Sequence, residues 1–326
     1  MVRWSQLLPL LLLTVSCGGQ AVVRGAAVPP GPGAPVEGVP AVPRAEPADP
    51  PCTELGCRLF DTPQQAFAEV LRSNPKILGV GEWHSLKRHK GLTSPVARFT
   101  EQLLPMLGGK ASDLVIELWL GTGKCEQQQQ EVEREQAPVR EQQSEATPNE
   151  FVLLGKRARA LRIFPHGLEP SCEDFERVLR AGDDSIQQML ELTARMFRDQ
   201  ATSWFNINMN QGVDGMVVTY SGAMHNDLHP DHACGDACAF GKQLSINTGG
   251  RYVEVDLVVP EYIHDGPVWS QRSWYRHFDR TRVHRKTTLF NPWPGSYVLI
   301  FPSTPDWKPP KEPAGRSGGS NSSSAR

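Results

Sequence analysis

Two Gly-x-x-His tetrapeptides each follow a short apolar run that is rich in β-branched residues. Residues 81–84 (GEWH) follow one such run, and residues 222–225 (GAMH) follow another. Glycine allows the chain to leave a strand sharply, close to a site. We therefore expect His84 and His225 to turn back into one crevice, although a single tetrapeptide of this kind also arises by chance.

Carboxylates accompany these two histidines. Glu82 lies inside the first tetrapeptide, and Glu117 ends a further apolar run, residues 113–118 (DLVIEL). His84, Glu117 and His225 could hold a divalent metal, which would lower the pKa of a bound water and polarise a carbonyl. Without a metal, Glu82 and His84 could act as a general acid/base pair. The hypothesis is a hydrolase with Glu82 as general base, and a catalytically dead domain is the alternative.

The elements that must position these residues are strands alternating with helices. The pattern predicts an α/β fold with a mixed, mostly parallel sheet flanked by helices and a site at the carboxyl ends of the strands. The predicted strands are 77–81, 113–118, 161–165, 215–222, 252–259 and 297–301. The last strands run closer together in the sequence, and we expect them to be antiparallel. The predicted helices are 62–73, 95–107, 151–161, 171–181 and 184–204.

Three further residues are weaker ligand candidates. His166 and Glu169 follow the third predicted strand, and His229 follows the second tetrapeptide in a segment rich in His, Asp and Cys. We expect His229 and the nearby His232 to be loop residues at the rim of the site. Residues 271–286 are strongly basic and aromatic, which fits a solvated face, contact with anionic lipid headgroups, or contact with haem propionates.

Seven cysteines leave one without a partner if the others pair. Cys17 follows an apolar run that is too short to span a bilayer. This run is typical of a signal peptide, and we expect residues 1–16 to be that peptide, with an end that resembles a lipobox. Ordinary secretion with cleavage near Ala26 or Ala27 is the alternative. We expect Cys17 to carry a lipid and to anchor the chain to the bilayer of the cell envelope, at the outer membrane.

An exported chain meets an oxidising compartment, where cysteines pair. Cys52 with Cys57 and Cys234 with Cys238 are local candidate pairs, although Cys234 and Cys238 could instead bind a metal. Cys125 and Cys172 would be left for each other. This last pairing is an inference by elimination, because six cysteines allow fifteen connectivities.

The rest of the chain divides by composition. Residues 17–51 are rich in Pro, Ala and Gly and should form an extended tether, residues 52–303 the folded domain, and residues 304–326 a disordered tail. Residues 124–150 form a Gln/Glu-rich insertion that is either solvated or a lid over the site. A formal net charge of −2 excludes a dominant nucleic-acid footprint.

GEWH after ILGV, with GAMH later and DLVIEL between them, resembles the paired Gly-x-x-His signature of the erythromycin esterase/ChaN-like/Tiki-TraB superfamily. The resemblance covers residues 55–302 and implies an α/β fold whose site would be formed by Glu82, His84, Glu117 and His225. It implies either a hydrolase, as in Tiki-like metal-dependent proteases and erythromycin-esterase-like lactone hydrolases, or a haem-binding lipoprotein of the ChaN type. A small molecule, a peptide or haem would be the ligand. The insertion 124–150 departs from the pattern.

Overall fold

A computed structural model describes residues 52–121, 123–137, 141–230, 234–279 and 285–306. The signal peptide, Cys17, the tether up to residue 51, His232 and the tail beyond residue 306 lie outside the described residues. In the described part of the chain, no helix is long and apolar enough to cross a membrane.

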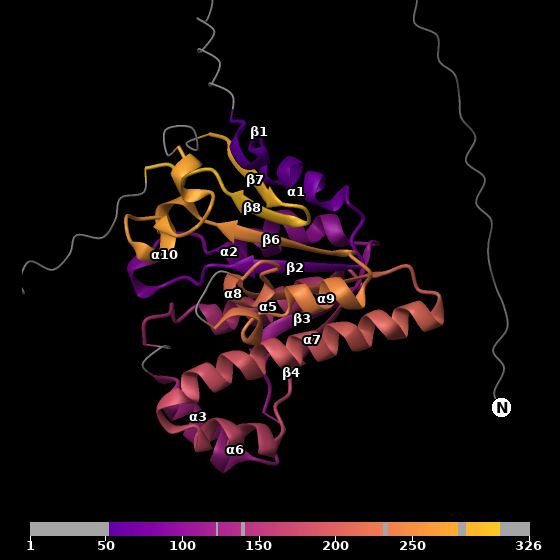
Figure 1. Ribbon diagram of the computed structural model, residues 1–326, viewed down its shortest axis with the longest axis vertical. Helices are drawn as coiled ribbons and strands as arrows, with labels where there is room; N and C mark the ends of the chain where they lie inside the picture. The colour runs from indigo at the N-terminus through magenta and orange to yellow at the C-terminus, as the bar shows by residue number, and fades with distance from the viewer. Residues whose placement is uncertain (1–51, 122, 138–140, 231–233, 280–284, 307–326) are drawn as a thin grey trace, which may run out of the picture. The chain divides into compact units, whose positions relative to one another are not determined.

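The core is one eight-stranded sheet, with the strand order β1-β7-β8-β6-β2-β5-β3-β4 (Figure 1). β4, β3, β5, β2, β6 and β8 are parallel, whereas β7 pairs antiparallel with both β8 and β1. The mixed, mostly parallel α/β fold is therefore confirmed. The expectation that the last predicted strands are antiparallel is wrong, because β6 and β8 pair parallel and the antiparallel neighbour of β8 is β7, which follows β6 in the sequence. The strands are β1 (Arg58–Phe60), β2 (Ile77–Glu82), β3 (Ala111–Trp119), β4 (Phe164–Leu168), β5 (Met216–Gly222), β6 (Tyr252–Val258), β7 (Thr287–Trp293) and β8 (Ser296–Ile300).

Helices cover both faces of this sheet, so the central strands are buried on both sides (Figure 1). Successive residues of β2 enter different cores: Leu78 packs with one cluster and Ile77 with the other. This explains why the central strands are continuously apolar rather than alternating. The helices are α1 (Pro63–Leu71), α2 (Pro95–Arg98), α3 (Glu126–Glu135), α5 (Thr147–Ala160), α6 (Cys172–Arg180), α7 (Ser185–Gln211), α8 (Ala223–Asn226), α9 (Gly241–Asn247) and α10 (Pro267–Ser270).

Local signals set several helix ends where the sequence predicts them. The hydroxyl of Thr62 accepts a hydrogen bond from the Gln65 amide at 3.2 Å and caps α1. Residues 95–107 are not one α-helix, because α2 passes into a π turn, Phe99–Leu103, and a 3-10 turn, Leu104–Leu107, around Pro105. Proline lacks the amide hydrogen that a regular helix needs.

The third strand begins later than predicted. α5 continues to Ala160, and Arg162 then takes a positive φ of 63° in the turn that follows. β4 therefore starts at Phe164, and His166 lies within this strand instead of beyond its end. The expectation that His166 projects from a strand end is wrong for this reason.

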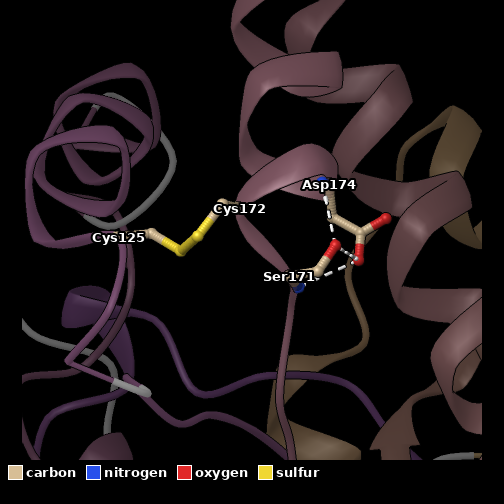
Figure 2. The surroundings of a disulfide bond; sticks show 4 residues. All are labelled: Cys125, Ser171, Cys172 and Asp174. Atoms are coloured by element: carbon tan, nitrogen blue, oxygen red, sulfur yellow. Dashed lines mark hydrogen bonds between the residues drawn. A yellow bond between two sulfur atoms is a disulfide. The ribbon is translucent and has the colours of Figure 1, made fainter.

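All three expected disulfides are present: Cys52–Cys57, Cys125–Cys172 and Cys234–Cys238. Figure 2 shows that the Cys125–Cys172 bridge leads into the first turn of α6. There Ser171 and Asp174 form a reciprocal capping box. The bridge thus ties the beginning of the Gln/Glu-rich insertion to a well-capped helix.

The insertion 124–150 is helical in its described parts and only partly solvated. α3 is mostly exposed, but Val132 is buried in the core that α6 and α7 share. At its other end, the Ser144 amide donates to the Ser85 carbonyl at 2.8 Å, and the Lys87 amide donates to the Gln142 carbonyl at 3.0 Å. The insertion therefore contacts the loop that follows His84, and a role as a lid stays a prediction.

Candidate functional site

The sheet order places the ends of three neighbouring parallel strands together. β5 lies between β2 and β3, with Glu82 paired to Gly222 in register. Glu82 ends β2, Glu117 lies near the end of β3, and α8, directly after β5, carries His225. The structure therefore brings Glu82, His84, Glu117 and His225 to one edge of the sheet.

Glu82 and His84 form a hydrogen-bonded pair. One carboxylate oxygen of Glu82 lies 2.8 Å from Nδ1 of His84, and the other accepts a hydrogen bond from the Tyr220 hydroxyl at 2.6 Å. Glu82 is only 2% exposed, so both of its oxygens are committed to these partners. Because a carboxylate only accepts, Nδ1 of His84 carries hydrogen, and Nε2 is the atom directed at the site.

Glu117 lies between the two imidazoles. Its Oε2 is 4.0 Å from Nε2 of His84, and its Oε1 is 3.9 Å from Nε2 of His225. The Gly222 amide donates to Oε2 of Glu117 at 2.6 Å and holds the carboxylate in place. Both nitrogen–oxygen distances are too long for a direct hydrogen bond. The three groups therefore face one another across a gap, which a shared small polar group can bridge.

A backbone carbonyl fixes the orientation of the His225 ring. Its Nδ1 lies 2.8 Å from the carbonyl oxygen of Cys238, and the residue is 3% exposed. A carbonyl can only accept, so Nδ1 carries the hydrogen here as well. Cys238 is disulfide-bonded to Cys234, so these cysteines are not metal ligands. The bridge instead closes the short loop that presents this carbonyl.

The surroundings of His84 favour its charged form. Burial lowers the pKa of His84, but the hydrogen bond to Glu82 and the negative charges of Glu117 and Glu82 outweigh it and raise the pKa to about 9. A raised histidine pKa stabilises the folded protein fully below the unfolded value of about 6.5. That contribution is lost as the pH rises through about 9.

His84, Glu117 and His225 are residue types that bind divalent metals, but their ligand atoms lie too far apart for a tetrahedral metal site. In a tetrahedral site with bonds near 2.1 Å, two ligand atoms lie about 3.5 Å apart. The distances from Glu117 to His84 and His225 exceed this. Among the described residues, no group of three or more His, Cys, Asp or Glu side chains is arranged to hold a metal ion. A divalent metal at His84, Glu117 and His225 therefore stays a prediction.

The three weaker candidates lie elsewhere. Nε2 of His166 lies 2.8 Å from Asp113, and the ring stacks on Trp204 at 4.2 Å. Asp113 precedes Glu117 by four strand residues, roughly 13 Å, so His166 belongs to a separate polar cluster. His229 is exposed and lies 5.5 Å from the Trp293 ring, and Glu169 is exposed.

Several residues of the site escaped the sequence reasoning. Tyr220 and the Gly222 amide hold the two carboxylates, and Phe151 lies edge-on to His84 with 6.5 Å between ring centroids. Tyr220 is two residues before Gly222 on β5, and side chains two apart share one face of a strand. This spacing could have predicted that Tyr220 lies on the same face of β5 as the site, whereas nothing in the sequence indicated Phe151.

The basic segment 271–286 contributes one neighbour to this region. The Arg272 guanidinium lies over the Trp83 ring at 5.1 Å, and Trp83 also packs on Trp269 with ring centroids 4.3 Å apart. Trp83 is the residue between Glu82 and His84. Residues 280–284 of the segment lie outside the described residues, and contact with lipid or haem stays a prediction.

Comparison with known proteins adds little to this geometry. No protein-family model matches the chain, and no curated protein matches it. Among solved structures, the chain is similar to the type III effector HopBA1, with 9% identity, 77% of this chain and 99% of that chain covered, and a TM-score of 0.35. It is also similar to a protein from Bacillus cereus, with 10% identity, 75% and 94% covered, and a TM-score of 0.34.

Proposed function

We propose that the protein is a hydrolase of the erythromycin esterase/Tiki type whose site is formed by Glu82, His84, Glu117 and His225. The observation that carries the proposal is the gap between Glu117 and the two imidazoles. Each Nε2 is directed at this carboxylate, and each Nδ1 is held by an acceptor behind the ring. Imidazoles whose tautomer is fixed in this way are a recurring device of acid/base catalysis.

In this proposal, His84 is the general base and Glu82 is its orienting partner. A water in the gap gives a proton to Nε2 of His84 as its oxygen attacks the carbonyl carbon of an ester or lactone, which forms a tetrahedral intermediate. When this intermediate collapses, the bond between the carbonyl carbon and the alcohol oxygen breaks, and the His84 imidazolium returns the proton to the leaving alkoxide. Glu82 holds the tautomer and stabilises the imidazolium that forms, a role that its burial and its bonds to His84 and Tyr220 support. Glu117 and His225 position the water. The base role thus passes from Glu82, where the sequence suggested it, to His84.

The cellular setting is also a proposal. Three disulfides support an oxidising compartment, because such bonds are rare in the cytosol. We propose an envelope protein that is anchored to the bilayer through a lipid on Cys17. In this setting the hydrolase would act on a small molecule or a peptide outside the cytoplasm. Haem binding of the ChaN type remains the alternative, and the described residues offer no specific observation that favours it.

Gly222→Ala tests whether the position of His84 matters. The added methyl would lie 3.1 Å from Nε2 of His84, which is tighter than ordinary contact. The backbone at Gly222, with φ −56° and ψ 140°, accepts alanine. We therefore expect the free energy of unfolding to change by about 1 kcal/mol or less, while kcat/KM for ester hydrolysis falls about 10- to 100-fold.

Gly108→Ala is the matched control for this variant. Gly108 has a similar φ of −55°, and its added methyl would contact only Pro105 and Leu161 at 3.4 Å or more. It should leave kcat/KM unchanged. Equal rates for the two alanine variants in stopped assays would count against the assignment of His84.

A further inference from the structure

A groove of about 300 Å³ lies beside the candidate site, between α5 and the ends of β3 and β4. Its walls are mainly apolar, and α5 adds two cationic side chains in the half of the groove away from Phe151. Its lining includes Leu118, Leu120, Phe151, Val152, Lys156 and Arg159, and the polar side chain of His166 also borders it. The volume is at the lower end of ligand pockets, which span roughly 300–1,000 Å³.

One flank of α5 forms one wall of this groove. Phe151, Val152, Gly155, Lys156 and Arg159 recur at the three- and four-residue spacing that places side chains on one side of a helix. From Phe151 to Arg159 the helix rises about 12 Å. The groove therefore runs from the neighbourhood of His84, which Phe151 contacts, toward the two cations.

Gly155 keeps the middle of the groove open. A glycine inside a helix costs about 1 kcal/mol relative to alanine. A Cβ at this position would lie at ordinary contact, 3.6 Å from Ile116 and from Pro165. Alanine would therefore fit without displacing a neighbour, whereas a longer side chain would enter the groove.

The groove exposes apolar surface and unpaired positive charge together. Leu120 is 39% exposed and Val152 is 44% exposed. Within the described residues, neither Lys156 nor Arg159 makes an ion pair or a side-chain hydrogen bond, unlike many other cations of the fold. A mainly apolar groove that carries two such cations on one side is complementary to a chain with an anionic end.

We propose that this groove binds a straight-chain fatty carboxylate, with its carboxylate at Lys156 and Arg159 and its alkyl chain extending toward Phe151. A peptide would fit less well, because the walls offer few side-chain partners for buried backbone amides. Phe151 borders both this groove and His84, but the proposal needs no reaction. It stands whether or not His84 is catalytic.

The test is calorimetric titration of the full-length chain with dodecanoate below its micelle-forming concentration. We expect saturable binding that weakens at least tenfold in the double variant Lys156→Glu/Arg159→Glu, since charge-assisted contacts are lost and repulsion is added. Arg157→Glu is the matched control, because Arg157 is exposed on the same helix but does not line the groove. It should bind like the wild type.

Two further comparisons separate shape from charge. Gly155→Leu should abolish binding, whereas Gly155→Ala should retain it within a few-fold. Dodecyltrimethylammonium, which has the same chain and a cationic head, should bind at least tenfold more weakly than dodecanoate. His84→Ala should bind dodecanoate like the wild type, which keeps this proposal distinct from the hydrolase proposal.

Three results would overturn the proposal. One is the absence of saturable dodecanoate binding, and another is equal affinity in the double variant and in Arg157→Glu. The third is haemin binding, seen as a Soret shift, that the double variant loses and dodecanoate does not displace, because the groove would then hold a planar anion.

Discussion

His84→Ala is expected to reduce the hydrolysis of esters and lactones by about 10²- to 10⁴-fold, the usual contribution of a positioned general base. The imidazole is the group whose Nε2 is directed into the gap beside Glu117, and no neighbouring side chain replaces it there. Stopped assays of a panel of nitrophenyl esters and lactones, with wild type and variant at equal concentration, measure the loss. Glu82→Gln should lose nearly as much activity, because the amide no longer fixes the required tautomer.

The control for this variant is His264→Ala. His264 is exposed, and its Nδ1 bonds a backbone carbonyl, as that of His225 does. It should keep the wild-type rate.

Because Nε2 of His84 must be free of a proton to act as a base, kcat/KM should rise with pH up to about 9 and then level off. Wild-type hydrolysis no faster than that of His84→Ala, or activity that appears only when Zn²⁺ is added, would contradict the metal-free mechanism.

Among the three disulfides, removing the Cys125–Cys172 bridge should cause the largest loss of stability. In the chain-entropy description, a bridge that closes a loop of 47 residues contributes about 4 kcal/mol. The bridge fixes the first end of the insertion, whereas the backbone hydrogen bonds to Ser85 and Lys87 hold its other end, and Val132 is the buried residue of α3. We expect Cys125→Ala/Cys172→Ala to lower the free energy of unfolding by about this amount in guanidinium titrations followed by circular dichroism.

Cys52→Ala/Cys57→Ala is the matched comparison. It also removes one bridge, but the sequence separation is only 5, for which the same description gives about 2 kcal/mol. The ratio of the two losses is therefore the informative quantity. Equal losses would show that strain or packing, and not loop closure, sets the value of these bridges.

Much of the fold could be predicted because the central strands have a simple physical signature. The runs that became β2 and β5 are continuously apolar, as strands covered on both faces must be. β1 and β7 were missed. β1 is three residues long, and β7 contains a proline and ends in exposed positions, so neither has the apolar run of a central strand. Their pairing depends on the sheet edge that β8 provides.

The candidate site was predictable where the sheet itself brings residues together. Gly-x-x-His at the ends of two strands implies proximity once these strands are parallel neighbours, as β2 and β5 are. The partners behind the rings were not predictable. The Cys238 carbonyl lies next to His225 only because the Cys234–Cys238 loop folds back. Every residue has a backbone carbonyl, so residue types do not indicate which carbonyl will accept a hydrogen bond. His166 was misplaced because the turn at Arg162 shifted the start of β4.

The most direct test of the central claim needs no substrate, because it asks whether His84 lies between two carboxylates. Histidine NMR titration of the metal-free full-length chain should give His84 a midpoint near 9, since Glu82 and Glu117 favour its charged form. Glu117→Gln removes one of these charges and should move the midpoint down toward the ordinary value of about 6.5. A wild-type midpoint near 6.5 that Glu117→Gln leaves unchanged would contradict the proposed site.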